Sequence, residues 1–323
     1  MSGNEFGDTV RRTLLARGTS IRATARALKY DHAYLSRVLA GKQLPSPELA
    51  LSLDEFLGAE GTLKDLASAL TDDDRARIQH VVSTPSKLDR QTVNALADVL
   101  AAQRRLDDAI GPSPMLIPTE VQAATARELL RGARGPHREA LVDVVAEWVQ
   151  FEGWLHASAR NDARAYVLLD EALDLADEAN SGTLAAQALN FRGYIARQQQ
   201  RPGAVARWFS AAYVTPGAHA AQRMGDAAQA AQGLAGIGRI DDARRMLNDA
   251  AELSDAASDQ PPGTAYWLTP SFQRLNLGLA HLELGERAEA AEHLRGGIEG
   301  LPAEQQSAEW GKEYRAALES AAG

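Results

Sequence analysis

Apolar and small residues recur at helical spacing through residues 19–42, TSIRATARALKYDHAYLSRVLAGK. Ser20 is a typical N-cap residue, and the pattern after it predicts a first short helix. Residues 29–31 break this pattern, and a second helix is predicted to begin at His32. The apolar residues of the second helix fall at i, i+3 and i+4 and define its buried face: Leu35, Val38 and Leu39. The segment therefore predicts two short helices joined by a tight turn.

The polar side of the second helix is predicted to face solvent. It carries His32, Ala33, Ser36 and Arg37. Gly41 can supply the left-handed residue that ends this helix, and Ser46-Pro47-Glu48 provides an N-cap, a first-turn proline and an acid for the next one. We expect a compact five-helix domain over residues 5–69.

The run SIRATARALKYDHAYLSRVLAGKQLPSPELALSLDEFLG resembles the Cro/cI-like, or XRE, helix-turn-helix family. The resemblance implies a motif helix that starts against a phosphate and a recognition helix whose first turn and a half meets bases in the major groove. Ile21 stands where many relatives have a Gln that touches phosphate, so Arg22 or Arg26 is expected to replace that contact. Arg37 is the strongest candidate for base reading, because its guanidinium can donate two parallel hydrogen bonds to guanine. The implied DNA contacts are Ser20, Arg22, Arg26, His32, Ala33, Tyr34, Ser36, Arg37 and Lys42.

Charge is distributed unevenly along the chain. The whole chain has a net charge of −9. Residues 1–58 hold eight Arg or Lys against six Asp or Glu, a net +2, so the remainder carries −11. A net positive N-terminal region attached to a net negative remainder attracts polyanions to the N-terminal region. The negative charge of the remainder is also explained by an ordinary solvated protein surface.

From about residue 70 the pattern is helical throughout, with no alternating strand pattern of useful length. An all-α fold follows. Residues 89–110 predict one amphipathic helix, and the Gly- and Pro-rich stretch 111–118 after it is the best hinge candidate. We therefore expect a DNA-binding domain over 1–70, a helical linker over 71–118 and a repeat domain with a C-terminal capping helix over 119–323.

An internal repeat occupies the last of these regions. It is anchored on the small residues Gly153, Gly193, Ala231 and Gly278, spaced 40, 38 and 47 apart. Sixteen positions after each anchor comes a large residue: Leu169, Phe209, Leu247 and Leu294. Small residues let two antiparallel helices approach closely while the large residue fills the gap, so each unit is predicted to be a helical hairpin that stacks on its neighbours. The last unit, residues 276–302, resembles a tetratricopeptide repeat.

In the tetratricopeptide family the first helices of the hairpins line a concave groove. Carried over from the anchors, the groove residues implied to bind a ligand are Gln150, Trp154, Gln187, Asn190, Tyr194, Arg197 and Gln232. Amides at one end and apolar residues at the other suit an extended peptide, with Arg197 taking a carboxylate. Ordinary solvated helix faces have the same composition, and the sequence leaves both interpretations open.

Other motifs point away from catalysis. Gly233–Gly238 imitates a dinucleotide-binding loop, but no strand precedes it and it lies at a predicted hairpin turn. No histidine pair has helical metal-ligand spacing, and Asp72–Asp74 is a capped helix start. The chain has no cysteine. We expect no enzyme activity, no cofactor and no metal.

Length and composition favour a cytoplasmic protein. The 323 residues include 45% apolar residues, enough for buried cores, and carry neither a signal peptide nor a membrane-length apolar run. The combination of head and repeats resembles peptide-responsive quorum-sensing regulators and head-plus-repeat regulators of high-GC actinobacteria. That resemblance implies a transcriptional regulator that binds double-stranded DNA as a homodimer and senses a peptide or small-molecule effector. The alternative is a docking scaffold whose repeats bind a partner protein and whose DNA contact is secondary.

Overall fold

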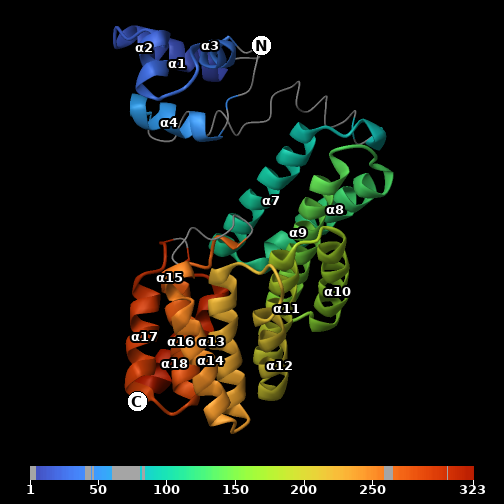
Figure 1. Ribbon diagram of the computed structural model, residues 1–323, viewed down its shortest axis with the longest axis vertical. Helices are drawn as coiled ribbons and strands as arrows, with labels where there is room; N and C mark the ends of the chain where they lie inside the picture. The colour runs from blue at the N-terminus through green and yellow to red at the C-terminus, as the bar shows by residue number, and fades with distance from the viewer. Residues whose placement is uncertain are drawn as a thin grey trace. The chain divides into compact units, whose positions relative to one another are not determined.

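The computed structural model divides into two compact units, Met1–Ser83 and Thr84–Gly323, and each is described by itself (Figure 1). The structure describes residues 5–40, 45, 47–59, 81, 84–257, 265–303 and 305–323. Every regular element in these ranges is a helix. The all-α prediction is confirmed for the described part of the chain.

The first unit is built from four described helices. They are α1 (Glu5–Ala16), α2 (Ile21–Ala27), α3 (His32–Leu39) and α4 (Pro47–Leu57). Their buried side chains form one core: Phe6, Val10, Leu14, Ala25, Leu35, Val38, Leu39, Leu49, Ala50, Leu53 and Leu57. The predicted inward residues of α3 all belong to it. The expected fifth helix, Gly41 and Ser46 lie outside the described residues.

Side-chain caps and one left-handed residue set the turn between α2 and α3. Ser20 caps α2 by accepting a 3.1 Å hydrogen bond from the Ala23 amide. Asp31 caps α3 by accepting a 2.7 Å hydrogen bond from the Tyr34 amide. Between them Lys29 adopts φ +59°, an uncommon conformation for a residue other than Gly. These local preferences produce the two predicted helices at their predicted positions.

The second unit is a succession of helical hairpins. Its longer helices are α7 (Arg90–Ile110), α8 (Pro112–Gly132), α9 (Arg138–Ser158), α10 (Asp162–Glu178), α11 (Gly182–Gln198), α12 (Pro202–Tyr213), α13 (Ala220–Gly236), α14 (Ile240–Glu252), α16 (Pro270–Glu283), α17 (Arg287–Glu299) and α18 (Lys312–Ala322). Its short elements are η1 (Pro85–Lys87), α15 (Ser254–Ala257) and η3 (Glu309–Gly311).

The repeat anchors lie where the two helices of each hairpin touch. A Cβ added at Gly153 would lie 3.1 Å from Leu169 Cδ2, and one added at Gly278 would lie 2.6 Å from Leu294 Cγ. Ala231 shares a core cluster with Leu247, the large residue of its own unit. The small-to-large pattern thus marks the helix–helix contact of a repeated hairpin. The hairpin array is confirmed, while its assignment as a tetratricopeptide array stays a prediction.

The Gly- and Pro-rich stretch after α7 forms a tight corner and a helix start. Gly111 turns the chain with φ +80°, and α8 begins directly at Pro112, where a proline loses no helical hydrogen bond. Pro118 lies inside α8. The structure therefore has a corner at one residue where we expected a hinge over 111–118. It also assigns residues 84–118 to the second unit, whereas we expected a separate linker there.

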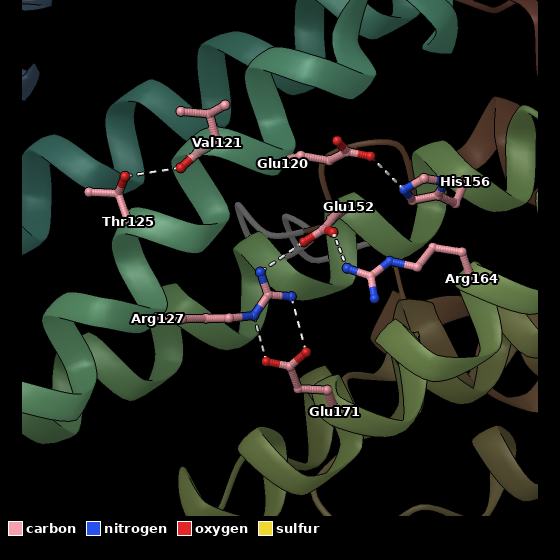
Figure 2. Close-up of polar contacts among 8 residues, drawn as sticks. All are labelled: Glu120, Val121, Thr125, Arg127, Glu152, His156, Arg164 and Glu171. Carbon is pink, nitrogen blue, oxygen red and sulfur yellow. Dashed lines mark hydrogen bonds and ion pairs between the residues drawn. The ribbon is translucent and has the colours of Figure 1, made fainter.

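An ion-pair network around the buried Glu152 links α8 to the first hairpin, α9 and α10 (Figure 2). Arg127 of α8 donates two hydrogen bonds to Glu171 of α10, at 2.5 and 3.0 Å, and a third to Glu152 of α9 at 2.9 Å. Arg164 of α10 donates to the other oxygen of Glu152 at 3.0 Å. Glu152 is 2% exposed, so loss of either arginine would leave a buried carboxylate short of a partner. This network makes α8 part of the array.

Candidate functional site

The solvent face of α3 carries the residues expected to read bases. His32, Ala33 and Arg37 are exposed, whereas Tyr34 and Ser36 are half-buried. The opposite face of α3 is buried in the core of the first unit. The helix is therefore fixed by its apolar side and offers a basic, polar side to a partner.

The residues expected to contact phosphate lie on and before α2. Ser20, Arg22 and Arg26 are exposed. The Ser20 side chain is engaged as the N-cap of α2, which leaves its hydroxyl proton available to an external acceptor. Lys42 lies outside the described residues.

The second unit contains a pocket. Its empty volume is about 780 Å³, including open solvent at its mouth. Eight helices or loops contribute to its wall, which is lined by Arg104, Asp107, Asp108, Phe151, Trp154, Asn190, Phe191, Tyr194, Arg197, Gln229, Tyr266, Trp267, Leu268, Phe272, Trp310, Glu313 and Tyr314. Walls that combine aromatic and apolar side chains with a small number of polar groups are typical of small-molecule sites.

Four of the seven predicted ligand residues line this pocket: Trp154, Asn190, Tyr194 and Arg197. Gln150, Gln187 and Gln232 are not in its wall. Gln150 is 1% exposed and donates a 3.0 Å hydrogen bond to the Leu184 carbonyl, which places it between α9 and α11. Gln187 is equally buried, and Gln232 is half-buried. Whether any of the seven binds a ligand stays a prediction.

Aromatic rings form a continuous part of the wall. Trp154 lies 5.1 Å from Phe191 and 4.9 Å from Tyr194 between ring centroids. Phe191 in turn lies 6.0 Å from Trp267. The ring planes are inclined to one another by 30–49°, so the rings do not stack flat.

Two neighbouring carboxylates of α7 face this aromatic wall. Asp107 accepts a 2.9 Å hydrogen bond from the Trp154 indole, and burial raises the pKa of Asp107 to about 7 in spite of that bond. Asp108 accepts hydrogen bonds from Tyr266 at 2.6 Å, Gln305 at 3.1 Å and the Trp310 indole at 3.2 Å. Asp108 therefore organises the wall, while Asp107 has more acceptor capacity left.

The polar side chains expected to bind a peptide have partners within the chain. Arg197 donates to both oxygens of Glu313 on α18, at 3.2 and 2.7 Å, and to Gln229 at 2.6 Å. Burial acts to lower the pKa of Arg197, but the attraction of Glu313 outweighs it and the pKa is raised. Asn190 donates a 2.6 Å hydrogen bond to Asp226. An external carboxylate would compete with Glu313 for Arg197.

Several residues of the pocket wall were not predicted from the sequence. Asp107 and Asp108 lie in the segment expected to be a linker, and Tyr266 and Trp267 follow a long inter-repeat loop. None of them belongs to the repeat pattern. Two sequence features could have indicated these residues. One is the adjacent acid pair Asp107 and Asp108 on the helix before the repeats, and the other is the adjacent aromatic pair Tyr266 and Trp267 in a connection between repeats.

Comparison with known proteins bears on the first unit. Residues 5–67 match the family model described as a helix-turn-helix domain. A search of curated proteins and a search of solved structures found no match. Among the described helices, none combines the length and apolar character needed to span a membrane. This match to a helix-turn-helix domain supports an XRE-like DNA-binding domain in residues 5–67.

Proposed function

We propose that this chain is a sequence-specific transcriptional regulator whose helical array binds an effector. The observation that carries the proposal is the solvent face of α3, which presents His32, Ala33 and Arg37 within a matched helix-turn-helix domain. A helix in this position enters the major groove, where its side chains reach base edges. Arg37 is the base reader because a guanidinium matches the O6 and N7 acceptors of guanine.

Phosphate contacts supply the rest of the DNA affinity. Arg22 and Arg26 are exposed on α2, the helix that precedes the recognition helix. Such contacts fix the register of the domain on the duplex and weaken with salt, but they carry little sequence information. Loss of one of them should therefore lower affinity for all duplexes to a similar extent.

We further propose that the chain acts as a homodimer. One helix-turn-helix domain covers a single half-site, and pairing two domains adds affinity. The operator should then be an inverted repeat with half-site centres about 10 base pairs apart, or a multiple of that spacing.

The pocket of the second unit is the proposed effector site. Its wall includes α7, the first long helix after the boundary between the two units. A ligand that favours one arrangement of α7 over another could change DNA binding, whereas one that binds both equally would change nothing. The regulatory output thus depends on differential binding at this wall.

In vitro selection from a library of random duplexes, with the full-length chain as bait, tests the proposal. Selection should enrich one motif with two-fold symmetry, and its affinity should exceed that of unselected duplexes at a fixed salt concentration by about a thousandfold or more. A library that stays random after selection would contradict sequence-specific binding and favour a scaffold that docks a partner protein.

A further inference from the structure

We propose that the pocket of the second unit recognises an organic ammonium ion carried on a compact apolar frame, with Asp107 as its counter-ion and Trp154 and Phe191 as its aromatic wall. The inference names the effector class of the proposed regulator and rests on that proposal for its biological meaning. Binding itself can be measured without DNA.

The shape of the wall favours an ammonium group. The Trp154 ring contacts both Phe191 and Tyr194, with centroids 5.1 and 4.9 Å apart and ring planes inclined by 39° and 49°. The Arg197 guanidinium already lies over Tyr194, 5.7 Å from its ring centroid, so Trp154 and Phe191 are the rings left for an external cation. Inclined rings around a cavity can direct more than one π-face towards the same point. A cation within about 6 Å of such faces is attracted by the ring quadrupoles, and the attraction is strongest for Trp.

The charge balance of the wall also favours a cation. Arg104 is paired with Glu147 at 2.8 Å, and Arg197 is paired with Glu313 at 2.7 Å. Both guanidinium charges lining the pocket are therefore compensated by carboxylates of the chain. The two acids of α7, Asp107 and Asp108, remain as lining carboxylates for which the described residues provide no ion pair.

Of these two acids, Asp107 is the one placed to meet a ligand. Asp108 accepts three hydrogen bonds from side chains that are themselves part of the surrounding structure. Asp107 accepts one, from the Trp154 indole, so the anchoring acid and the best cation-binding ring are in direct contact. Burial raises the pKa of Asp107 to about 7, and a bound ammonium would supply the positive charge that its ionised form lacks.

An anionic or peptide ligand fits the same wall less well. Its carboxylate would have to displace Glu313 from the 2.7 Å pair with Arg197. Its backbone could use the Asn190 amide only in competition with Asp226, which already receives a 2.6 Å hydrogen bond from it. It would also approach two uncompensated carboxylates in a partly enclosed space, where repulsion is weakly screened.

Three probes of one shape and different charge test the inference on the full-length chain. They are choline, its neutral carbon isostere dimethylbutanol and the matching anion dimethylbutanoate, titrated by calorimetry up to millimolar concentration. Choline should bind at least about tenfold more tightly than either of the others, and its binding should change the fluorescence of the pocket tryptophans. Equal affinity of choline and dimethylbutanol, tighter binding of the anion, or no detectable choline binding would overturn the inference.

A matched pair of variants locates the site on α7. Asp107→Asn keeps the shape of the side chain and an acceptor for Trp154 but removes the charge, so it should weaken choline binding about tenfold and leave dimethylbutanol unchanged. Asp98→Asn is the same change at an exposed position of the same helix outside the pocket, and it should bind choline as the parent does. An unchanged choline affinity for Asp107→Asn would also overturn the inference.

The duplex selection run on the same preparation separates the two proposals. A protein that enriches a DNA motif but fails the choline test retains the regulatory function and loses the ligand class. A protein that binds choline as expected but enriches no motif retains the ammonium site and loses the regulatory function.

Discussion

Asp108 accepts a 2.6 Å hydrogen bond from the hydroxyl of Tyr266, a residue 158 positions later in the chain. The same hydroxyl lies 3.2 Å from the Arg104 carbonyl, one turn earlier on α7. Trp310, close to the C-terminus, donates its indole hydrogen to the other oxygen of Asp108 at 3.2 Å. Asp108, on the first long helix of the second unit, therefore links α7 to two segments near the C-terminal end of the array, and all three contribute to the pocket wall.

Removing the Tyr266 hydroxyl should destabilise the second unit. Tyr266→Phe leaves the ring in place but deprives the buried Asp108 carboxylate of its shortest hydrogen bond, at a cost of about 1–3 kcal/mol in the free energy of unfolding. Tyr213→Phe is a matched control, because its hydroxyl makes a longer, 3.2 Å bond to the half-buried Asp249. Denaturant titrations of both variants should show the larger loss for Tyr266→Phe, and similar losses for the two would argue against an organising role for Asp108.

The buried carboxylate of Asp226 should make the stability of the second unit depend on pH. Asp226 is fully buried, and desolvation raises its pKa to about 7, although hydrogen bonds from Asn190 and Gln222 oppose the rise. A raised carboxyl pKa means that the folded state holds the proton more tightly than the unfolded state. Its stabilising effect is thus complete below the unfolded pKa near 4 and is lost as the pH rises through about 7.

Asp226→Asn should remove this dependence. Relative to the parent chain, the variant should gain stability between about pH 5 and pH 8, by at most about 4 kcal/mol for the full shift. Asp174→Asn, an exposed acid on α10, should track the parent over the same range. Thermal melts of the three proteins at several pH values measure the difference, and parallel curves for Asp226→Asn and the parent would show that Asp226 titrates normally.

Local sequence patterns predicted the helices of this fold, but they did not predict the contacts between distant segments. Leu35 and its neighbours followed the 3.6-residue period, so the buried face of α3 and the exposed position of Arg37 could be derived from spacing alone. The repeat anchors were also predictable from spacing, because each close contact between the two helices of a hairpin requires a small residue. No such pattern marked Asp107 and Tyr266. Their roles depend on a contact in space between α7 and the connection that precedes α16, and a periodic sequence pattern does not reveal contacts of this kind.

The packing of a repeat anchor can be tested with one methyl group. A Cβ at position 193 would lie 2.7 Å from the Phe209 ring, closer than real contacts allow, so Gly193→Ala should cost about 1–3 kcal/mol through overpacking. Gly203→Ala, in α12, adds the same methyl group where the nearest atom is 3.9 Å away. That control should be neutral or stabilising by up to about 1 kcal/mol, because alanine favours a helix. Equal stability changes in denaturant titrations would refute the anchor assignment.

Titration of Arg37→Ala on two duplexes decides whether the first unit reads DNA sequence through α3. On the selected duplex the variant should lose about 1–3 kcal/mol of binding free energy, while on a scrambled duplex of equal length it should lose much less. Arg26→Ala, expected to remove a phosphate contact, should weaken both duplexes alike. Circular dichroism confirms that both variants are folded. We expect Arg37→Ala to lose affinity selectively for the selected duplex, and equal losses on the two duplexes would contradict base reading by α3.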